Sequence, residues 1–301
     1  MDLNKGGYIY EKFELKLSKI LACSNGPQVR NNLVWNEAQK YVAYSMQNIV
    51  VIESLNQEKT QRLLKEGNDQ IYQIKMSPSM RYLLAYSKTG PVDGFPCIYI
   101  FDAITFNKLN QIAISDAQID SVEFSGYSNM LLVVSSSKQG EDNLNTTVSV
   151  WDFIDGHKDI FCKSMLPIPV KAACWNPYVE GSGDEFCTIS DRCYHYWRIT
   201  ENLQLQYQEG ELPKKETEGF RDKTDTFTSL TFVQPDYLHH SVYMMLGLLS
   251  GYVWVTDTRT NQYLYNVKVL DDGDGGVQRI FSSHSRIVIE PANSAVFHCW
   301  D

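Results

Sequence analysis

Three residues near the middle of the chain are of types that bind zinc. Cys187, Cys193 and His195 lie close together on two runs of alternating apolar and polar residues, which predict adjacent strands. Cys193 and His195 are two positions apart, so they share one face of their strand. A closed structural zinc site requires four ligands at ordered spacing, and this stretch offers three. We therefore interpret all three as core residues and predict no metal site.

Other candidate chemistry is weaker still. The acidic run at residues 271–276 lacks the alternating oxygen ligands and the terminal Glu of an EF-hand loop, so it predicts a solvated turn. His298 and Cys299 are consecutive and point to opposite faces of a strand. His239 and His240 have no Ser or Cys partner in their predicted turn, and no P-loop, GxGxxG or GxSxG motif occurs. The sequence predicts no catalytic residue, no cofactor and no small-molecule substrate, and we expect a protein that is not an enzyme.

Composition restricts the partners. The 301 residues carry a net charge of −9. Nucleic-acid binding depends on Lys and Arg that neutralise phosphates, so we expect no nucleic acid among the partners. The same charge argues against docking on an anionic membrane. Seven cysteines without a CxxC pair predict reduced thiols, and neither a signal peptide nor an apolar stretch of about 20 residues is found. We expect a soluble intracellular, cytoplasmic protein that binds other proteins.

A repeat organises the whole chain. Short alternating runs, each closed by a polar residue, recur at intervals of 44 to 59 residues. The closing residues are Glu53, Asp102, Asp152, Arg198, Asp257 and Asp301. Each interval contains four short runs of period two separated by Ser, Pro, Asn or Gly, and no run has the 3.6-residue period of a helix. Repeated four-stranded units of this length are typical of propeller blades, so the sequence predicts an all-β protein, a β-propeller.

Six such units are visible, so the blade count is six or seven. The sixth unit would lack its outer strand, and the run at residues 13–21 could supply it by closing the ring. Alternatively, the chain is a fragment of a longer tandem-propeller protein. We expect a single propeller domain over residues 1–301. The large rings of five tryptophans are assigned to the core between sheets: Trp35, Trp151, Trp175, Trp197 and Trp300.

The third strands carry a family signature. Trp151-Asp152 and Trp300-Asp301 match the Trp-Asp ending of the WD-repeat family, and the other units carry degenerate forms of it. The chain resembles that family but lacks its Gly-His pair before the first strand, since Gly156-His157 follows a third strand. The family's buried His–Ser–Trp–Asp hydrogen-bond network therefore cannot form in its usual way, and we expect blade packing to rest on apolar contacts.

A narrower resemblance covers residues 16–54. This stretch is similar to the opening of the first propeller in the microtubule-associated and cilia- and flagella-associated WD-repeat proteins, which act as scaffolds on axonemal or centriolar microtubules. The resemblance implies a structural component of the cilium, flagellum, axoneme or centriole, with tubulin or axonemal proteins as partners. The alternative is a general intracellular adaptor, either a ubiquitin-ligase substrate receptor or a trafficking or coat subunit.

Long insertions mark one predicted rim. They lie at residues 89–96, 139–146, 209–225 and 271–276, in connections that share one face in the WD-repeat topology. Loops on a rigid scaffold commonly carry binding, and aromatic and Arg side chains dominate interface hot spots. The sequence therefore predicts protein-interaction residues at Phe95, Asn143, Phe220 and Arg221, against the alternative that these are merely solvated loops.

Overall fold

The computed structural model describes most of the chain from residue 32 onwards. The described residues are 32–55, 60–65, 70–88, 94–116, 118–127, 129–139, 143–154, 159–178, 185–212, 225–234, 241–271, 273–283, 286–294 and 297–300. Two compact units divide the chain, residues 1–119 and residues 120–301.

Among its described residues, the first unit contains two four-stranded antiparallel sheets, with strands in chain order. The first sheet comprises β1 (Leu33–Asn36), β2 (Tyr41–Met46), β3 (Ile49–Ser54) and β4 (Gln61–Lys65). The second comprises β5 (Ile71–Met76), β6 (Tyr82–Ser87), β7 (Cys97–Asp102) and β8 (Lys108–Ala113). Apolar residues of both sheets form one buried cluster that includes Ala43, Ile52, Ile74 and Leu83.

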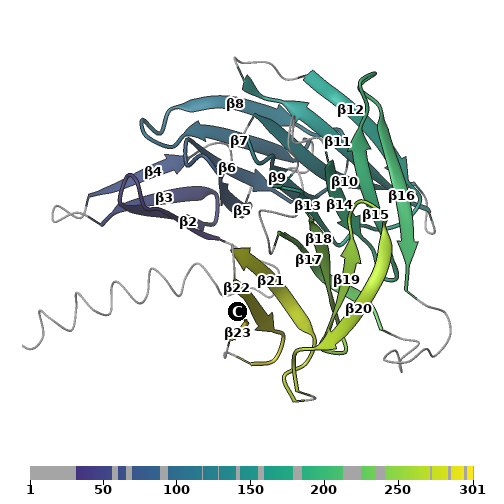
Figure 1. Cartoon of the computed structure of the whole chain (residues 1–301). Coiled ribbons are helices and arrows are strands. Elements are labelled where there is room, and N and C mark those ends of the chain that lie inside the picture. The colour runs from purple at the N-terminus through teal and green to yellow at the C-terminus, as the bar shows by residue number, and fades with distance from the viewer. Residues whose placement is uncertain are drawn as a thin grey trace, which may run out of the picture. The chain divides into compact units, whose positions relative to one another are not determined.

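The second unit contains three further four-stranded sheets and one three-stranded sheet within the described residues. The third sheet comprises β9 (Gln118–Phe124), β10 (Met130–Gln139), β11 (Asn143–Asp152) and β12 (Asp159–Leu166). The fourth comprises β13 (Ala172–Trp175), β14 (Glu185–Ile189), β15 (Cys193–Ile199) and β16 (Leu205–Glu211). The fifth comprises β17 (Phe227–Val233), β18 (Tyr243–Leu248), β19 (Tyr252–Asp257) and β20 (Gln262–Lys268). The last comprises β21 (Val277–Ser283), β22 (Arg286–Pro291) and β23 (His298–Trp300) (Figure 1).

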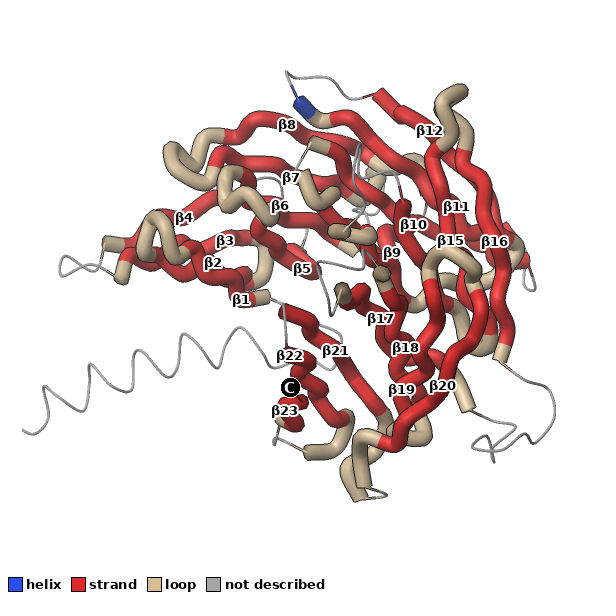
Figure 2. Tube along the Cα trace, viewed as in Figure 1, coloured by secondary structure: helices blue, strands red, loops and turns tan. Residues whose placement is uncertain are grey.

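Burial follows the order of strands within each sheet. The middle strands β6 and β7 are buried along almost their whole length, whereas the outer strands β4 and β16 are mostly exposed. These middle strands are buried on both faces, so both sets of alternate side chains must be apolar, as in the segment CIYIF of β7. Figure 2 shows how short the loops between most of these strands are. Each repeated set of four short alternating runs in the sequence thus corresponds to one sheet.

The closing aspartates of the third strands have a local structural role. The Asp102 carboxylate accepts hydrogen bonds from the backbone N–H groups of Ile104 (2.9 Å) and Thr105 (2.7 Å) and from the Thr105 hydroxyl (3.0 Å). Asp257 accepts the equivalent three bonds in the fifth sheet, and Asp152 accepts one in the third. The side chain satisfies donors that a tight turn leaves unpaired, which explains an Asp before the fourth strand.

The prediction that the tryptophans are core residues is confirmed in part. Trp175 and Trp197 are buried, and Trp151 is partly buried. Trp35 is 59% exposed, so its assignment to the core is wrong. Val34 lies on the face of β1 that packs against the second sheet, and Trp35 therefore lies on the opposite face. Nothing is described of the side chain of Trp300.

One buried hydrogen bond modifies the expectation of purely apolar packing. Trp197 Nε1 donates to Thr188 Oγ1 at 2.9 Å, and both side chains are fully buried. The Trp197 ring also stacks on Phe186 at a centroid distance of 5.7 Å. A polar contact between a third-strand Trp and a second-strand hydroxyl therefore forms even though no Gly-His pair precedes the first strand.

One predicted boundary is wrong. The insertion predicted at residues 139–146 is largely strand, because β10 and β11 pair from Met130↔Asp152 to Gln139↔Asn143. Successive Ser and Thr side chains lie across from each other in this extension, and such polar cross-strand pairs support a ladder without apolar burial. The sixth unit has three strands among the described residues, as expected. Residues 13–21, which were proposed to supply its fourth strand, lie outside the described residues.

None of the described residues belongs to a helix with the length and apolar character to span a bilayer.

Candidate functional site

Of the residues predicted for protein interaction, Phe95 is described most fully. Its side chain is 57% exposed in the connection between β6 and β7, where the sequence places it. Asn143 is the first residue of β11 rather than a loop residue. Phe220 and Arg221 lie outside the described residues. Phe95 belongs to the first unit and Asn143 to the second, so their role in protein interaction stays a prediction.

The fifth sheet exposes a more apolar surface at its outer strand. Four large side chains of β20 are exposed, more than on any other described strand: Tyr263, Leu264, Tyr265 and Val267. The other outer strands each expose one or two: Leu63, Leu109, Ile160, Met165 and Tyr207. Because several large apolar side chains exposed on one strand are uncommon away from binding sites, β20 is the leading candidate for an interaction surface.

The register of β20 spreads its apolar side chains over both faces. A bulge falls opposite Val255 and Thr256, where Leu264 has no Cα partner. Tyr265 pairs with Val255, whereas the Tyr263 ring packs on Trp254 at a centroid distance of 4.1 Å. β20 is the last strand in its sheet, so among the described strands none pairs with its outer edge. The backbone along the outer edge of β20 and the aromatic side chains of the same strand are therefore both open to a partner.

The sequence contained a signal for this surface. Outer strands of a blade are expected to alternate apolar and polar residues, but Tyr263, Leu264 and Tyr265 are three consecutive large apolar residues. The binding residues predicted from the sequence lie in insertions between strands, whereas this run lies within a strand. An unbroken apolar run on an outer strand is the feature that would have identified it.

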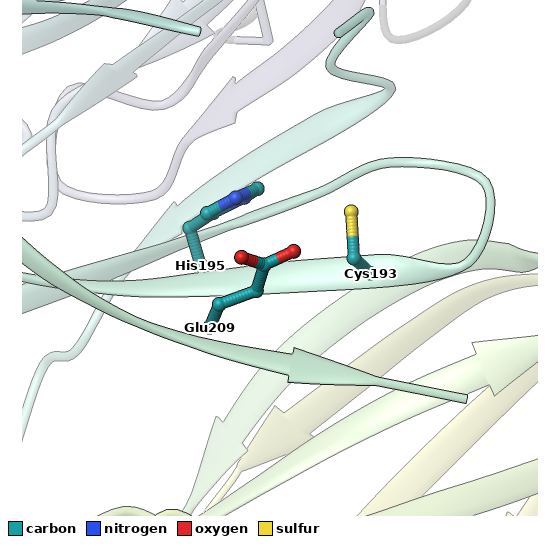
Figure 3. A group of neighbouring side chains, drawn as sticks. All are labelled: Cys193, His195 and Glu209. Carbon is teal, nitrogen blue, oxygen red and sulfur yellow. The ribbon is translucent and has the colours of Figure 1, made fainter. Parts of the chain in front are cut away.

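A second candidate lies on the fourth sheet, where three possible metal ligands converge. Cys193 and His195 share one face of β15, and Glu209 of β16 pairs directly with His195. Figure 3 shows all three side chains on one side of this strand pair. Their ligand atoms lie within 4.8 Å of one another. Cys187 pairs with Tyr196 and so lies on the other face, which removes it from this group.

The environment of this cluster favours uncharged forms of its buried members. Burial lowers the pKa of His195, and the neighbouring Glu209 carboxylate partly offsets this by raising it. Burial also raises the pKa of the Cys193 thiol; a hydrogen bond with Ser190 offsets part of this rise, and nearby carboxylates add to it. The His195 side chain is 2% exposed, packs edge-on against Tyr207 at 4.9 Å, and has a buried Nδ1 without a hydrogen-bond partner.

Comparison with known proteins identifies the fold. No protein-family model matches the chain, and no curated protein matches it. Among solved structures, the chain is similar to the β-propeller domain of Cps50 (Swd1) from Myceliophteria thermophila, with a TM-score of 0.53 and 17% identity. The match covers 73% of this chain and 62% of that chain. The chain has the fold of a WD-repeat-type β-propeller, as the repeat predicted; the likeness shows the fold alone.

Proposed function

We propose that this chain is a non-enzymatic protein-interaction scaffold and that β20 is a binding edge of its second unit. The observation that carries the proposal is the exposure of Tyr263, Leu264, Tyr265 and Val267 on one edge strand. Tyr contributes large, rigid contact area to interfaces, and an edge strand offers backbone donors and acceptors to an added strand. The partner that fits is an extended segment of another protein with apolar side chains.

Affinity capture with a matched pair of variants tests this proposal. Tyr265 (53% exposed) and Tyr127 (60% exposed) are both surface tyrosines, but Tyr127 lies in a turn outside β20. We expect Tyr265→Asp to reduce recovery of the specific partners at least fivefold, whereas Tyr127→Asp leaves recovery unchanged. Equal recovery with wild type and Tyr265→Asp, at equal unfolding midpoints, would contradict a role for β20.

The finer proposal is that this scaffold is a structural component of the cilium, axoneme or centriole that associates with microtubules. It is supported by the resemblance of residues 16–54, of which residues 32–54 are described and form β1, β2 and β3. The net charge of −9 disfavours direct contact with the acidic outer surface of microtubules, so docking through partner proteins or on the lumenal wall fits better.

Co-sedimentation with taxol-stabilised microtubules and localisation of a tagged full-length protein test the finer proposal. Enrichment on cilia or centrioles is the expected result. A diffuse cytosolic or nuclear signal would count against it, and recovery of cullin adaptors or coat subunits would favour the general adaptor.

The expectation of one propeller domain over residues 1–301 stays a prediction.

A further inference from the structure

The imidazole of His195 is a buried polar group that the surrounding protein leaves incompletely satisfied. It is 98% buried, and its Nδ1 has no hydrogen-bond partner. Buried side-chain nitrogens in native structures are nearly always bonded to protein, water or an ion, so an exception calls for a missing partner. The aromatic rings of Trp197 and Tyr207 pack around the imidazole and hold it in place without supplying that partner.

A thiol and a carboxylate lie near this imidazole. Cys193 Sγ, a Glu209 carboxylate oxygen and a His195 ring nitrogen all lie within 4.8 Å of one another. The arrangement is fixed by the β15–β16 register, which pairs His195 with Glu209, and by the two-residue period that brings Cys193 onto the same face. Figure 3 shows that no backbone segment of the strand pair separates the three groups.

We propose that Cys193, His195 and Glu209 bind a zinc ion. The proposal goes beyond the protein-binding role and does not depend on it. One sulfur, one nitrogen and one oxygen donor form a set that zinc accepts, whereas calcium and magnesium prefer oxygen donors alone. Zinc enters as the thiol proton leaves to solvent, so the ion binds a thiolate, a neutral imidazole and a carboxylate.

The geometry requires only a small closure of the three side chains. Zinc bond lengths of about 2.0–2.3 Å place tetrahedral ligand atoms about 3.3–3.6 Å apart. Glu209 is exposed and has three side-chain torsions. Its carboxylate can therefore rotate toward the imidazole and the thiol until the ligand atoms reach these separations, while His195 stays packed. Three protein ligands leave the fourth coordination position to water on the exposed side, next to Glu209.

The ion would join the outer strand to its neighbour. β16 is the edge strand of the fourth sheet and is mostly exposed, so few apolar contacts hold it. A zinc ion bound by Cys193 and His195 of β15 and Glu209 of β16 fastens that edge. Zinc removal is therefore expected to loosen β16 first, which hydrogen exchange of its amides would report.

Calorimetric titration of the full chain with zinc chloride tests the proposal, after tag removal and metal stripping. We expect one zinc per chain and at least a tenfold loss of affinity in Cys193→Ser and in Glu209→Gln, since loss of even an outer-shell partner costs about 10–100-fold. Cys174→Ser is the matched control, because Cys174 belongs to the same sheet and pairs with Cys187 on the other face. It is expected to bind zinc as wild type does.

Cobalt provides a second readout that is specific for the thiolate. Cobalt(II) in this site should give thiolate-to-metal absorption in wild type and in Cys174→Ser, and none in Cys193→Ser. Both ligand variants should fold without metal, because Cys193 is partly exposed and Glu209 is exposed. No stoichiometric binding by wild type, or equal binding by Cys193→Ser and Glu209→Gln, would overturn the proposal; the second result would place zinc elsewhere, for example at exposed Cys299.

Discussion

Replacing Thr188 by valine tests how much the buried bond to Trp197 stabilises the second unit. The two atoms are 2.9 Å apart and both side chains are fully buried. Valine has the shape of threonine, so the substitution creates no cavity, and the cost is the lost bond together with an unsatisfied indole N–H. We expect the free energy of unfolding to fall by about 1–3 kcal/mol.

Urea unfolding monitored by tryptophan fluorescence and by circular dichroism measures this change, and Thr188→Ser is the control that keeps the hydroxyl. For a unit of this size, the same change corresponds to a decrease in Tm of about 2–12 °C. In the Trp197→Phe background, the indole donor is absent and Thr188→Val should cost much less, as a double-mutant cycle will show. A loss below about 0.5 kcal/mol in wild type, or an equal loss in both backgrounds, would refute the reasoning.

Three further predictions follow from other contacts. A Cβ on Gly247 would meet Ser229 Oγ at 2.3 Å and Val277 Cγ1 at 2.6 Å, so Gly247→Ala should destabilise by about 1–3 kcal/mol in chemical unfolding, whereas Gly273→Ala, with no atom within 4 Å, should not. Hydrogen bonding from the Thr105 backbone holds the pKa of Asp102 below its ordinary 3.8. The ionised carboxylate therefore contributes its full stabilisation above pH 3.8, and this contribution is lost as the pH falls through the lower pKa of the folded state. Asp102→Ala should therefore reduce stability at neutral pH and flatten its acid dependence, and an unchanged pH profile would contradict this assignment. Cys299 is exposed, whereas burial raises the pKa of the Cys187 thiol, so alkylation of the native protein followed by mass spectrometry should modify Cys299 well before Cys187.

The fold was predictable because each strand carries its own signal. The alternating run at residues 193–199 coincides with β15, and the closing aspartates mark where third strands end. Burial at the first sheet was not predictable, because whether Trp35 is covered depends on which face of β1 meets a neighbouring sheet. The hairpin of β10 and β11 also extended beyond its apolar residues, since polar cross-strand pairs maintain the ladder.

The candidate sites were less accessible from sequence. Cys193 and His195 share a face by local periodicity, but Glu209 joins them only through the β15–β16 register, which depends on the length of the intervening turn. Cys187 is nearer in sequence than Glu209 and yet lies on the opposite face. The exposure of Tyr265 likewise depends on the position of β20 at the edge of its sheet. The residues of a strand do not by themselves indicate whether it lies at the edge or in the middle of a sheet.

Site-specific photo-cross-linking at Tyr265 tests most directly whether this propeller binds proteins through β20. A photoreactive phenylalanine analogue placed at Tyr265 should yield discrete cross-linked partners in cells, and the cross-linked peptide should be an extended apolar segment. The same analogue at Tyr127, which is slightly more exposed than Tyr265, should yield none of them. Identical cross-links from both positions, or no cross-link from Tyr265 in a folded protein, would contradict the account.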